Sequence, residues 1–187
     1  MNNEFEKKGY KVIDLNLREE SAYVEVEDLI IEIFEDTKIL PEFHNQVSIP
    51  PLDIYMETLS SIIHRDYTTP IVEKKIGLNL IPTFCYIRKY FQGSVLYSHV
   101  DRDACEISLS YCVSGPKWEI NMGNDTLITK RGNGIIYKGC EIKHERPKPS
   151  SGEVIQIFNH WVISDGTKSK SAYDDGMHKD FYKSTNI

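Results

Sequence analysis

A succession of short strand-like runs from residue 81 onward constrains the fold more than any other feature of the sequence. The runs are rich in β-branched and aromatic residues, and turn sequences such as SGP, GND and GNG separate them. Short strands at this close spacing are typical of a β-sandwich or a β-barrel, so we expect a β core over residues 81–163. The runs read TFCYIRKYF, CEISLSYCV, KWEINM, TLITK, GIIYKG, CEIKHER and EVIQIFNHWVI.

The chain before this core has a different pattern. Residues 21–40 and the run LDIYMETLSSIIHRD place apolar side chains on one helical stripe, and Pro70 is expected to end that region. The last stretch is polar with few core-forming residues, which predicts a peripheral tail. The 187 residues therefore predict a single domain, with a helical support region at 1–80, the β core at 81–163 and the tail at 164–187.

Composition narrows the function classes. Hydrophobic residues make up 40% of the chain, yet no apolar run approaches the ~18–20 residues of a membrane span, and the charged N-terminus lacks a signal core. We expect a soluble, cytoplasmic protein without a membrane partner.

A net charge of −6 argues against a general nucleic-acid binder. The sequence shows no signal for an oligomeric state, and the four cysteines form no C-x-x-C pair, which predicts reduced thiols.

The pattern H-x-D, which metalloenzymes use to hold iron, begins at His64, His99 and His178. On a strand, residues i and i+2 face the same side and converge on one ion, whereas on a helix they point about 200° apart. His64 ends a helix-patterned segment, and His178 lies in the polar tail. Only His99 and Asp101 stand between strand-like runs, so we expect this copy to carry the chemistry.

A third metal ligand must come from farther along the chain. The downstream candidates are His144, in CEIKHER, and His160, in FNHWV. We favour His144 as the ligand and expect His160 to be a core histidine or one that supports the ligands. Two imidazoles and one carboxylate leave coordination positions open on Fe(II), which suits a cosubstrate and O2.

The stretches RKYFQGSVLYSHVDRDACEISLSYCV and GNGIIYKGCEIKHERPKPSSGEVIQIFNHWV resemble the Fe(II)/2-oxoglutarate-dependent dioxygenases, in the prolyl-4-hydroxylase-like branch. An aromatic-then-glycine turn precedes H-x-D, a G-x-x-x-x-Y-x-G segment follows, and a distal histidine comes before a Pro- and Gly-containing loop. The similarity covers about residues 83–163. It is specific to the superfamily and not to a substrate.

The resemblance implies a mainly β fold with flanking N-terminal helices, a double-stranded β-helix or cupin-like jelly roll. It implies Fe(II) held by His99, Asp101 and His144 as the catalytic centre. It also implies 2-oxoglutarate as cosubstrate and O2 as oxidant. Oxidative decarboxylation to succinate would then be coupled to C–H hydroxylation of a prolyl, amino-acid, peptide or other small substrate.

The sequence departs from this family at one position. A basic residue is expected nine or ten residues after the distal histidine, to bind the far carboxylate of 2-oxoglutarate, but Glu153 and Val154 stand there. Arg146 is our first replacement, because it shares a strand face with His144 and its planar fork suits a carboxylate. Arg88 and Lys148 are the reserves. Tyr90 and Tyr111 match positions where relatives place tyrosines that bind 2-oxoglutarate.

Two other functions compete with this interpretation. One is a cupin-like module that binds a metal or small molecule without turnover, although all three metal ligands are present. The other is a zinc hydrolase, which needs a general base near the metal-bound water. Glu145 neighbours His144, but adjacent residues of a strand face opposite ways, so it is poorly placed for that role.

Overall fold

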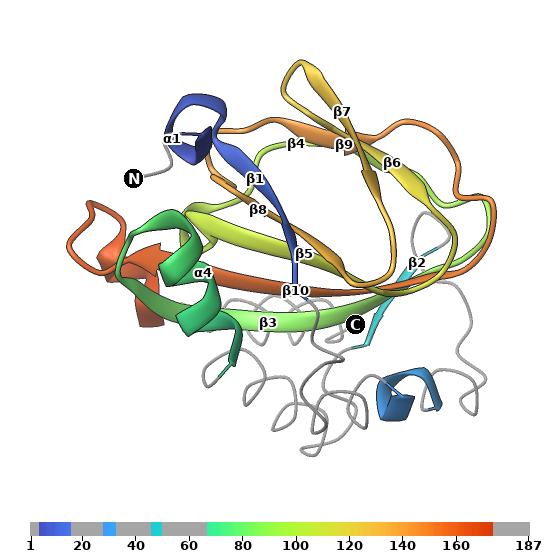
Figure 1. Cartoon of the computed structure of the whole chain (residues 1–187), viewed down its shortest axis with the longest axis horizontal. Coiled ribbons are helices and arrows are strands. Elements are labelled where there is room, and N and C mark those ends of the chain that lie inside the picture. The colour runs from blue at the N-terminus through green and yellow to red at the C-terminus, as the bar shows by residue number, and fades with distance from the viewer. Residues whose placement is uncertain (1–3, 16–27, 33–45, 50–66, 174–187) are drawn as a thin grey trace, which may run out of the picture.

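The computed structural model describes residues 4–15, 28–32, 46–49 and 67–173, and within these it forms two facing sheets (Figure 1). All the strand pairings are antiparallel. The larger sheet has the order β1 (Tyr10–Asp14), β8 (Asn133–Tyr137), β5 (Ile107–Ser114), β10 (Val154–Ile163), β3 (Leu80–Tyr90) and β2 (Gln46–Ile49). The smaller has the order β4 (Leu96–His99), β9 (His144–Arg146), β6 (Trp118–Met122) and β7 (Asp125–Thr129).

The way in which the chain moves between these sheets defines the architecture. Strands β3, β5, β8 and β10 belong to one sheet, and strands β4, β6, β7 and β9 belong to the other. The chain therefore crosses repeatedly from one layer to the other, which is the winding of a jelly roll. The predicted double-stranded β-helix is confirmed.

The larger sheet packs its outer face against the helices. Side chains of alternate parity on β5 and β10, such as Leu109 and Trp161, form a buried cluster with Val72 of α4 (Thr69–Ile76) and with Ile30. The indole nitrogen of Trp161 donates a hydrogen bond of 2.8 Å to the Thr69 hydroxyl and so fixes α4 on the sheet. The opposite face of the same strands points into the space between the sheets.

The N-terminal region differs from the expectation. It contributes β1 and β2, which extend the larger sheet at both edges, so residues 1–80 are not a purely helical support. The segment YKVID buries Tyr10 and Ile13, three residues apart, and exposes Val12, so its burial does not follow a clean period of two. Helix α1 (Glu4–Lys8) and residues 28–32 are helical. The rest of the predicted helices, including the H-x-D at His64, lies outside the described residues.

Pro70 begins a helix and does not end one. It occupies the first turn of α4, where its missing N–H leaves no hydrogen bond unmade. The tail continues the fold as far as a 3-10 helix at Ser169–Tyr173, and the H-x-D at His178 lies outside the described part of the chain. Another 3-10 helix, Asp103–Cys105, follows the H-x-D at His99. No helix among the described residues is long and apolar enough to cross a bilayer.

Candidate metal centre

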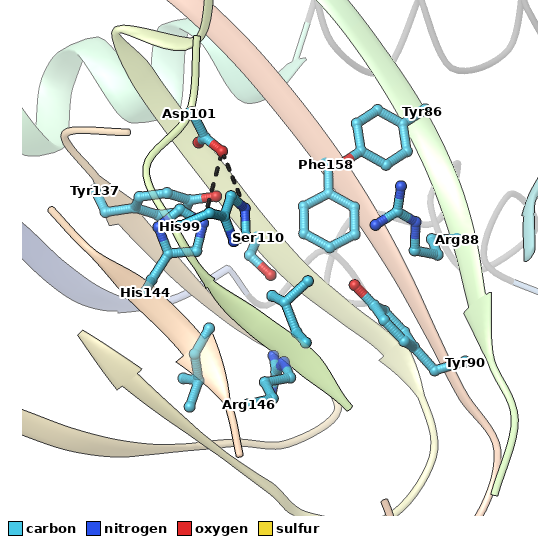
Figure 2. Close-up of a pocket in the computed structure, with 12 residues that line it drawn as sticks. Tyr86, Arg88, Tyr90, His99, Asp101, Ser110, Tyr137, His144, Arg146 and Phe158 are labelled. Atoms are coloured by element: carbon cyan, nitrogen blue, oxygen red, sulfur yellow. Dashed lines mark ion pairs between the residues drawn. The ribbon is translucent and has the colours of Figure 1, made fainter. Parts of the chain in front are cut away.

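A pocket lies between the two sheets, with the predicted metal ligands at one end (Figure 2). His99 is the last residue of β4, and His144 is the first residue of β9. The two residues are register partners in the β4–β9 ladder, so backbone pairing alone brings them together. Asp101 follows two residues after His99, where its backbone N–H donates to the carbonyl of Gly139 at 2.8 Å.

The three side chains converge on one point. Both Nε2 atoms lie 3.6 Å from the same carboxylate oxygen, Oδ1 of Asp101. One ligand atom from each of the three residues lies within 4.8 Å of the other two. Two imidazole nitrogens and one carboxylate oxygen in this arrangement match the donor set that binds Fe(II) while leaving coordination positions open.

Backbone carbonyls fix the tautomer of both histidines. Nδ1 of His99 lies 2.8 Å from the carbonyl oxygen of Tyr97, and Nδ1 of His144 lies 2.9 Å from that of Ile142. A carbonyl oxygen only accepts, so each Nδ1 carries a proton. In the neutral rings each Nε2 then presents its lone pair toward Asp101, as a metal ligand must.

Burial and charge act in opposite directions on these groups. A hydrogen bond with Asp101 raises the pKa of His99, whereas burial lowers the pKa of His144. Burial alone would raise the pKa of Asp101, but the hydrogen bond that Nε2 of His99 donates when that ring is protonated, together with the nearby histidines, outweighs burial and lowers that pKa. The carboxylate is therefore ionised at neutral pH, when the buried imidazole beside it is neutral.

The second oxygen of Asp101 is held by a hydrogen-bond chain. Oγ of Ser108 lies 3.0 Å from Oδ2 of Asp101 and 2.9 Å from Nδ1 of His160. Burial lowers the pKa of His160 to about 4, so this ring is neutral at pH 7. The hydroxyl proton bonds the charged carboxylate, and Nδ1 of His160 donates to the hydroxyl. His160 therefore supports the predicted ligand Asp101 through Ser108, as expected. Oδ1 of Asp101 takes no part in this chain and can bind an ion.

Gly139 makes room for this arrangement. A Cβ at this position would lie 2.5 Å from Oδ2 of Asp101 and 2.8 Å from Oγ of Ser108, closer than atoms can pack. Any larger residue would displace the carboxylate or the serine. The packing around Asp101 and Ser108 therefore requires glycine at position 139, in the sequence YKGCEIKH.

Arg146 lies deeper in the same pocket, as the strand parity predicts. Its side chain is only 1% exposed, and its guanidinium lies 4.4 Å from the Trp118 ring. Nη1 donates to two backbone carbonyls and to the Thr129 hydroxyl, at 3.1–3.3 Å. Nη2 is buried and has no hydrogen-bond partner among the described residues. Burial lowers the pKa of Arg146 to about 10, so an anion in the pocket would satisfy a charge that the described residues leave uncompensated.

The two reserve cations lie in different surroundings. Arg88 of β3 lines the pocket and packs against the aromatic rings of Tyr86, Tyr90 and Phe158. Lys148 is exposed and pairs with Glu119 at 2.7 Å, and it does not line the pocket. The structure therefore brings two arginines, and not the lysine, to the candidate centre.

The predicted tyrosines separate. Tyr90 lines the pocket, whereas Tyr111 lies in the core cluster on the outer face of β5. This placement contradicts the expectation for Tyr111, because Ser108 and Ser110 occupy the inward parity of that strand. Sequence reasoning missed Tyr86 and Tyr137, which line the pocket. The parity of Tyr86 with Arg88 and Tyr90 on one strand was an available signal.

No protein-family model matches the chain, and no curated protein matches it. Solved structures do resemble it. A Trichoplax adhaerens prolyl hydroxylase in complex with a hypoxia inducible factor peptide fragment has a TM-score of 0.62 at 14% identity, over 91% of this chain and 88% of that one. A Burkholderia pseudomallei oxidoreductase of the 2OG-Fe(II) oxygenase family has a TM-score of 0.61 at 13% identity, over 84% and 85%.

A third structure is HygX from Streptomyces hygroscopicus, with nickel, 2-oxoglutarate and hygromycin B bound. Its TM-score is 0.61 at 14% identity, over 88% of this chain and 86% of that one. Similarity at such low identity establishes architecture and not activity. The chain therefore shares the jelly-roll fold of these oxygenase structures, and its His-Asp-His cluster lies between the two sheets of that fold.

Proposed function

We propose that the protein is a non-haem Fe(II)- and 2-oxoglutarate-dependent dioxygenase that hydroxylates a prolyl, amino-acid, peptide or other small substrate. The observation that carries this proposal is the convergence of two Nε2 lone pairs and one carboxylate oxygen in a pocket that also contains a buried arginine. Fe(II) fits the donor set, and the unpartnered Nη2 of Arg146 fits the far carboxylate of 2-oxoglutarate. When bound, the metal and 2-oxoglutarate would activate O2, which is the oxidant for C–H hydroxylation.

The residues of the chain have separable roles in this function. His99, Asp101 and His144 hold the metal, and Ser108 keeps the second oxygen of Asp101 away from it. Arg146 anchors the cosubstrate, because its Nη1 is already fixed by three acceptors and only Nη2 remains to be satisfied.

Aromatic rings form the remaining wall of the site. Tyr86, Tyr90, Tyr137 and Phe158 line the pocket and reduce the access of water to the reacting groups. Tyr90 is proposed to bind the cosubstrate together with Arg146. The compared structures contain a hypoxia inducible factor peptide fragment in one case and hygromycin B in another, which supports this fold as a host for bound molecules of very different size.

The test is anaerobic addition of Fe(II) and 2-oxoglutarate to the full chain. We expect a weak visible metal-to-ligand charge-transfer band, because 2-oxoglutarate would chelate the iron. Asp101→Ala should abolish the band. Asp103→Ala is the matched control, since it removes a carboxylate two residues away that is exposed and pairs with Lys168. A wild-type protein without the band would refute the cosubstrate proposal.

A second variant tests the arginine. Arg146→Ala should raise the 2-oxoglutarate concentration needed for half of the band by about a hundredfold, while Fe(II) still binds, since a lost charge-assisted bond in a buried site costs about 1.5–3 kcal/mol. Unchanged 2-oxoglutarate affinity would move the assignment to Arg88. Release of succinate on admission of O2 and candidate substrates separates an oxygenase from a cupin-like module that binds without turnover.

A further inference from the structure

Tyr137 is the tyrosine of the G-x-x-x-x-Y-x-G segment that runs from Gly132 to Gly139. It is the last residue of β8 and lines the pocket together with the metal ligands. Its side chain is buried, and its ring meets the ring of His144 edge-on, with 4.8 Å between the two centroids. The fold therefore holds this tyrosine directly against the metal centre.

The hydroxyl of Tyr137 points toward the side chains that converge on the metal position (Figure 2). Tyr137 is the register partner of Ser108 on β5, so the two side chains lie next to each other on the inner face of the sheet. Burial, followed by the negative charge of Asp101, raises the pKa of Tyr137 well above its usual value. The phenol therefore keeps its proton at neutral pH and can donate it.

The described polar groups around this phenol are already engaged in other bonds. Ser108 gives its proton to Oδ2 of Asp101 and accepts a hydrogen bond from Nδ1 of His160, so its interaction with Tyr137 is a third and weaker one. Oδ1 of Asp101 faces the Nε2 atoms of both histidine ligands. Ser110, another hydroxyl of the lining, donates to the side chain of a neighbouring glutamine. The phenol proton therefore stays available to a bound ligand.

A 2-oxo acid bound at this centre needs a hydrogen-bond donor at its metal end. Its first carboxylate would bind the metal next to the carboxylate of Asp101, and two like charges that lie close together in a pocket with little water repel each other. A hydrogen bond from a neutral phenol stabilises the incoming carboxylate and adds no charge beside the metal. Arg146, the proposed anchor of the far carboxylate, lies deeper in the pocket (Figure 2).

We infer that Tyr137 is a cosubstrate-binding residue whose phenol donates a hydrogen bond to the carboxylate that chelates the metal. This inference rests on the proposed function and adds a second anchor to it, with Tyr137 at the metal end of the ligand and Arg146 at the far end. The two contacts place different demands on the ligand. The contact with Tyr137 needs only the 2-oxo acid group, whereas the contact with Arg146 needs the second carboxylate.

The test compares 2-oxoglutarate with 2-oxopentanoate, a 2-oxo acid of the same chain length that lacks the far carboxylate. Each acid is titrated anaerobically into the full-length protein loaded with Fe(II), and the charge-transfer band gives the half-saturating concentration. Tyr137→Phe keeps the ring and removes the hydroxyl, so it should raise this concentration about tenfold for both acids, as for one charge-assisted hydrogen bond. Arg146→Met should raise it for 2-oxoglutarate alone.

Tyr10→Phe is the matched control. Tyr10 is a buried tyrosine and the register partner of Tyr137 on β1, but its hydroxyl donates to Asp125 and it does not line the pocket. Both half-saturating concentrations should stay within about twofold of wild type in this variant. The Fe(II) affinity without added acid, measured with a metal-binding dye, shows whether the metal ligands are still in place. It should also stay within about twofold in Tyr137→Phe.

Four results would overturn the inference. Unchanged affinity of Tyr137→Phe for both acids would show that the phenol makes no contact, and a loss confined to 2-oxoglutarate would place it at the far carboxylate. A tenfold loss of Fe(II) affinity without acid would make Tyr137 a support of the metal ligands. A wild type that gives the band with 2-oxoglutarate and not with 2-oxopentanoate would show that chelation depends on the far end.

The wild-type band with 2-oxoglutarate tests the proposed function separately. A wild type with this band and an unaffected Tyr137→Phe variant would reject only the role of Tyr137. A wild type without a band for either acid would reject the oxygenase, and the inference with it.

Discussion

The two faces of the larger sheet have opposite characters, although the same strands build both. On β5, Leu109 and its outward neighbours are apolar and buried against α4, whereas Ser108 and Ser110 face the barrel interior. Six buried side-chain atoms lack a hydrogen-bond partner within the described residues, and four of them belong to inward-facing residues. Most of the unpaired atoms therefore lie on the inner face, and the other two belong to Asn159.

This difference means that stability and binding can be disrupted separately. An unpaired buried polar group lowers stability, and proteins retain such groups mainly where a ligand satisfies them. We therefore expect substitutions on the outer face to lower the free energy of unfolding and to spare the site. Substitutions on the inner face should impair the site and leave unfolding nearly unchanged.

The largest effect is expected from Leu109→Ala. This fully buried side chain lies in the core cluster, so its truncation should lower the free energy of unfolding by about 2–5 kcal/mol. Urea unfolding followed by tryptophan fluorescence measures this change. Metal affinity of the folded variant should stay within about twofold of wild type. A variant of normal stability that no longer binds metal would show that the two faces are not separable.

The next effect is a pH dependence from His160. Its folded pKa of about 4 lies below the ordinary histidine value of 6.5, so between these values the unfolded chain binds the proton that the folded chain excludes. The free energy of unfolding should therefore fall as pH decreases from 6.5 to 4, by up to about 1.4 kcal/mol per pH unit.

Comparison with His160→Gln isolates this contribution, because the other groups titrate in both proteins. The free energy of unfolding of the metal-free wild type should fall more steeply than that of the variant as pH decreases through this window. Parallel pH profiles would mean that His160 is protonated in the folded protein, and the direction of the Ser108 hydrogen bond would then have to be reversed.

A smaller effect on Fe(II) binding should distinguish Ser108 from Ser110, two serines on the inner face. Ser108→Ala removes the hydrogen bond to Asp101 and should weaken Fe(II) binding by about 10- to 100-fold, the usual consequence of losing a group that orients a ligand. Ser110→Ala is the matched control, because Ser110 lines the pocket but bonds Gln156. Competition with a metal-binding dye measures both. Equal Fe(II) affinities of the two variants would show that Ser108 does not support metal binding.

The smallest effect on stability is expected from Arg146→Met. The variant loses three hydrogen bonds, but it also loses a buried charge that no carboxylate of the described residues compensates. These contributions oppose each other, so the unfolding free energy of the ligand-free protein should change by less than about 1 kcal/mol. Addition of 2-oxoglutarate to the metal-loaded protein should raise the melting temperature of the wild type and not that of the variant. A loss above 3 kcal/mol would make Arg146 a structural residue.

The strand periodicity predicted a β-sandwich or β-barrel core, and the family resemblance added the double-stranded β-helix and the set of three metal ligands. The period-2 rule placed His99 and Asp101 on one side and brought Arg146 into the same interior as His144. Tyr111 was misplaced because a family position was followed instead of that rule. The alternation in ISLSYCVS places Tyr111 on the apolar face of the strand. The sequence alone could therefore have predicted its position correctly.

Other features depend on contacts between distant segments and have no local signal. The chain Asp101–Ser108–His160 joins residues from three separate segments, and the space beside Gly139 is defined by Asp101 and Ser108. The strand β1 was missed because five residues carry little periodic information against a helical expectation for the region around them. Such features follow from packing, which the one-dimensional pattern does not record.

The pairing of β4 with β9 is a part of the barrel mouth that we expect to open easily. β4 is a four-residue strand at the margin of its sheet, and its ladder to β9 has an irregularity between the partners Leu96–Arg146 and His99–His144. Such margins open first in native-state fluctuations. An ion bound by both histidines would act as a clasp across this seam, so amide hydrogen exchange at residues 96–99 should slow on metal loading, while the helix-covered face of the larger sheet exchanges at an unchanged rate.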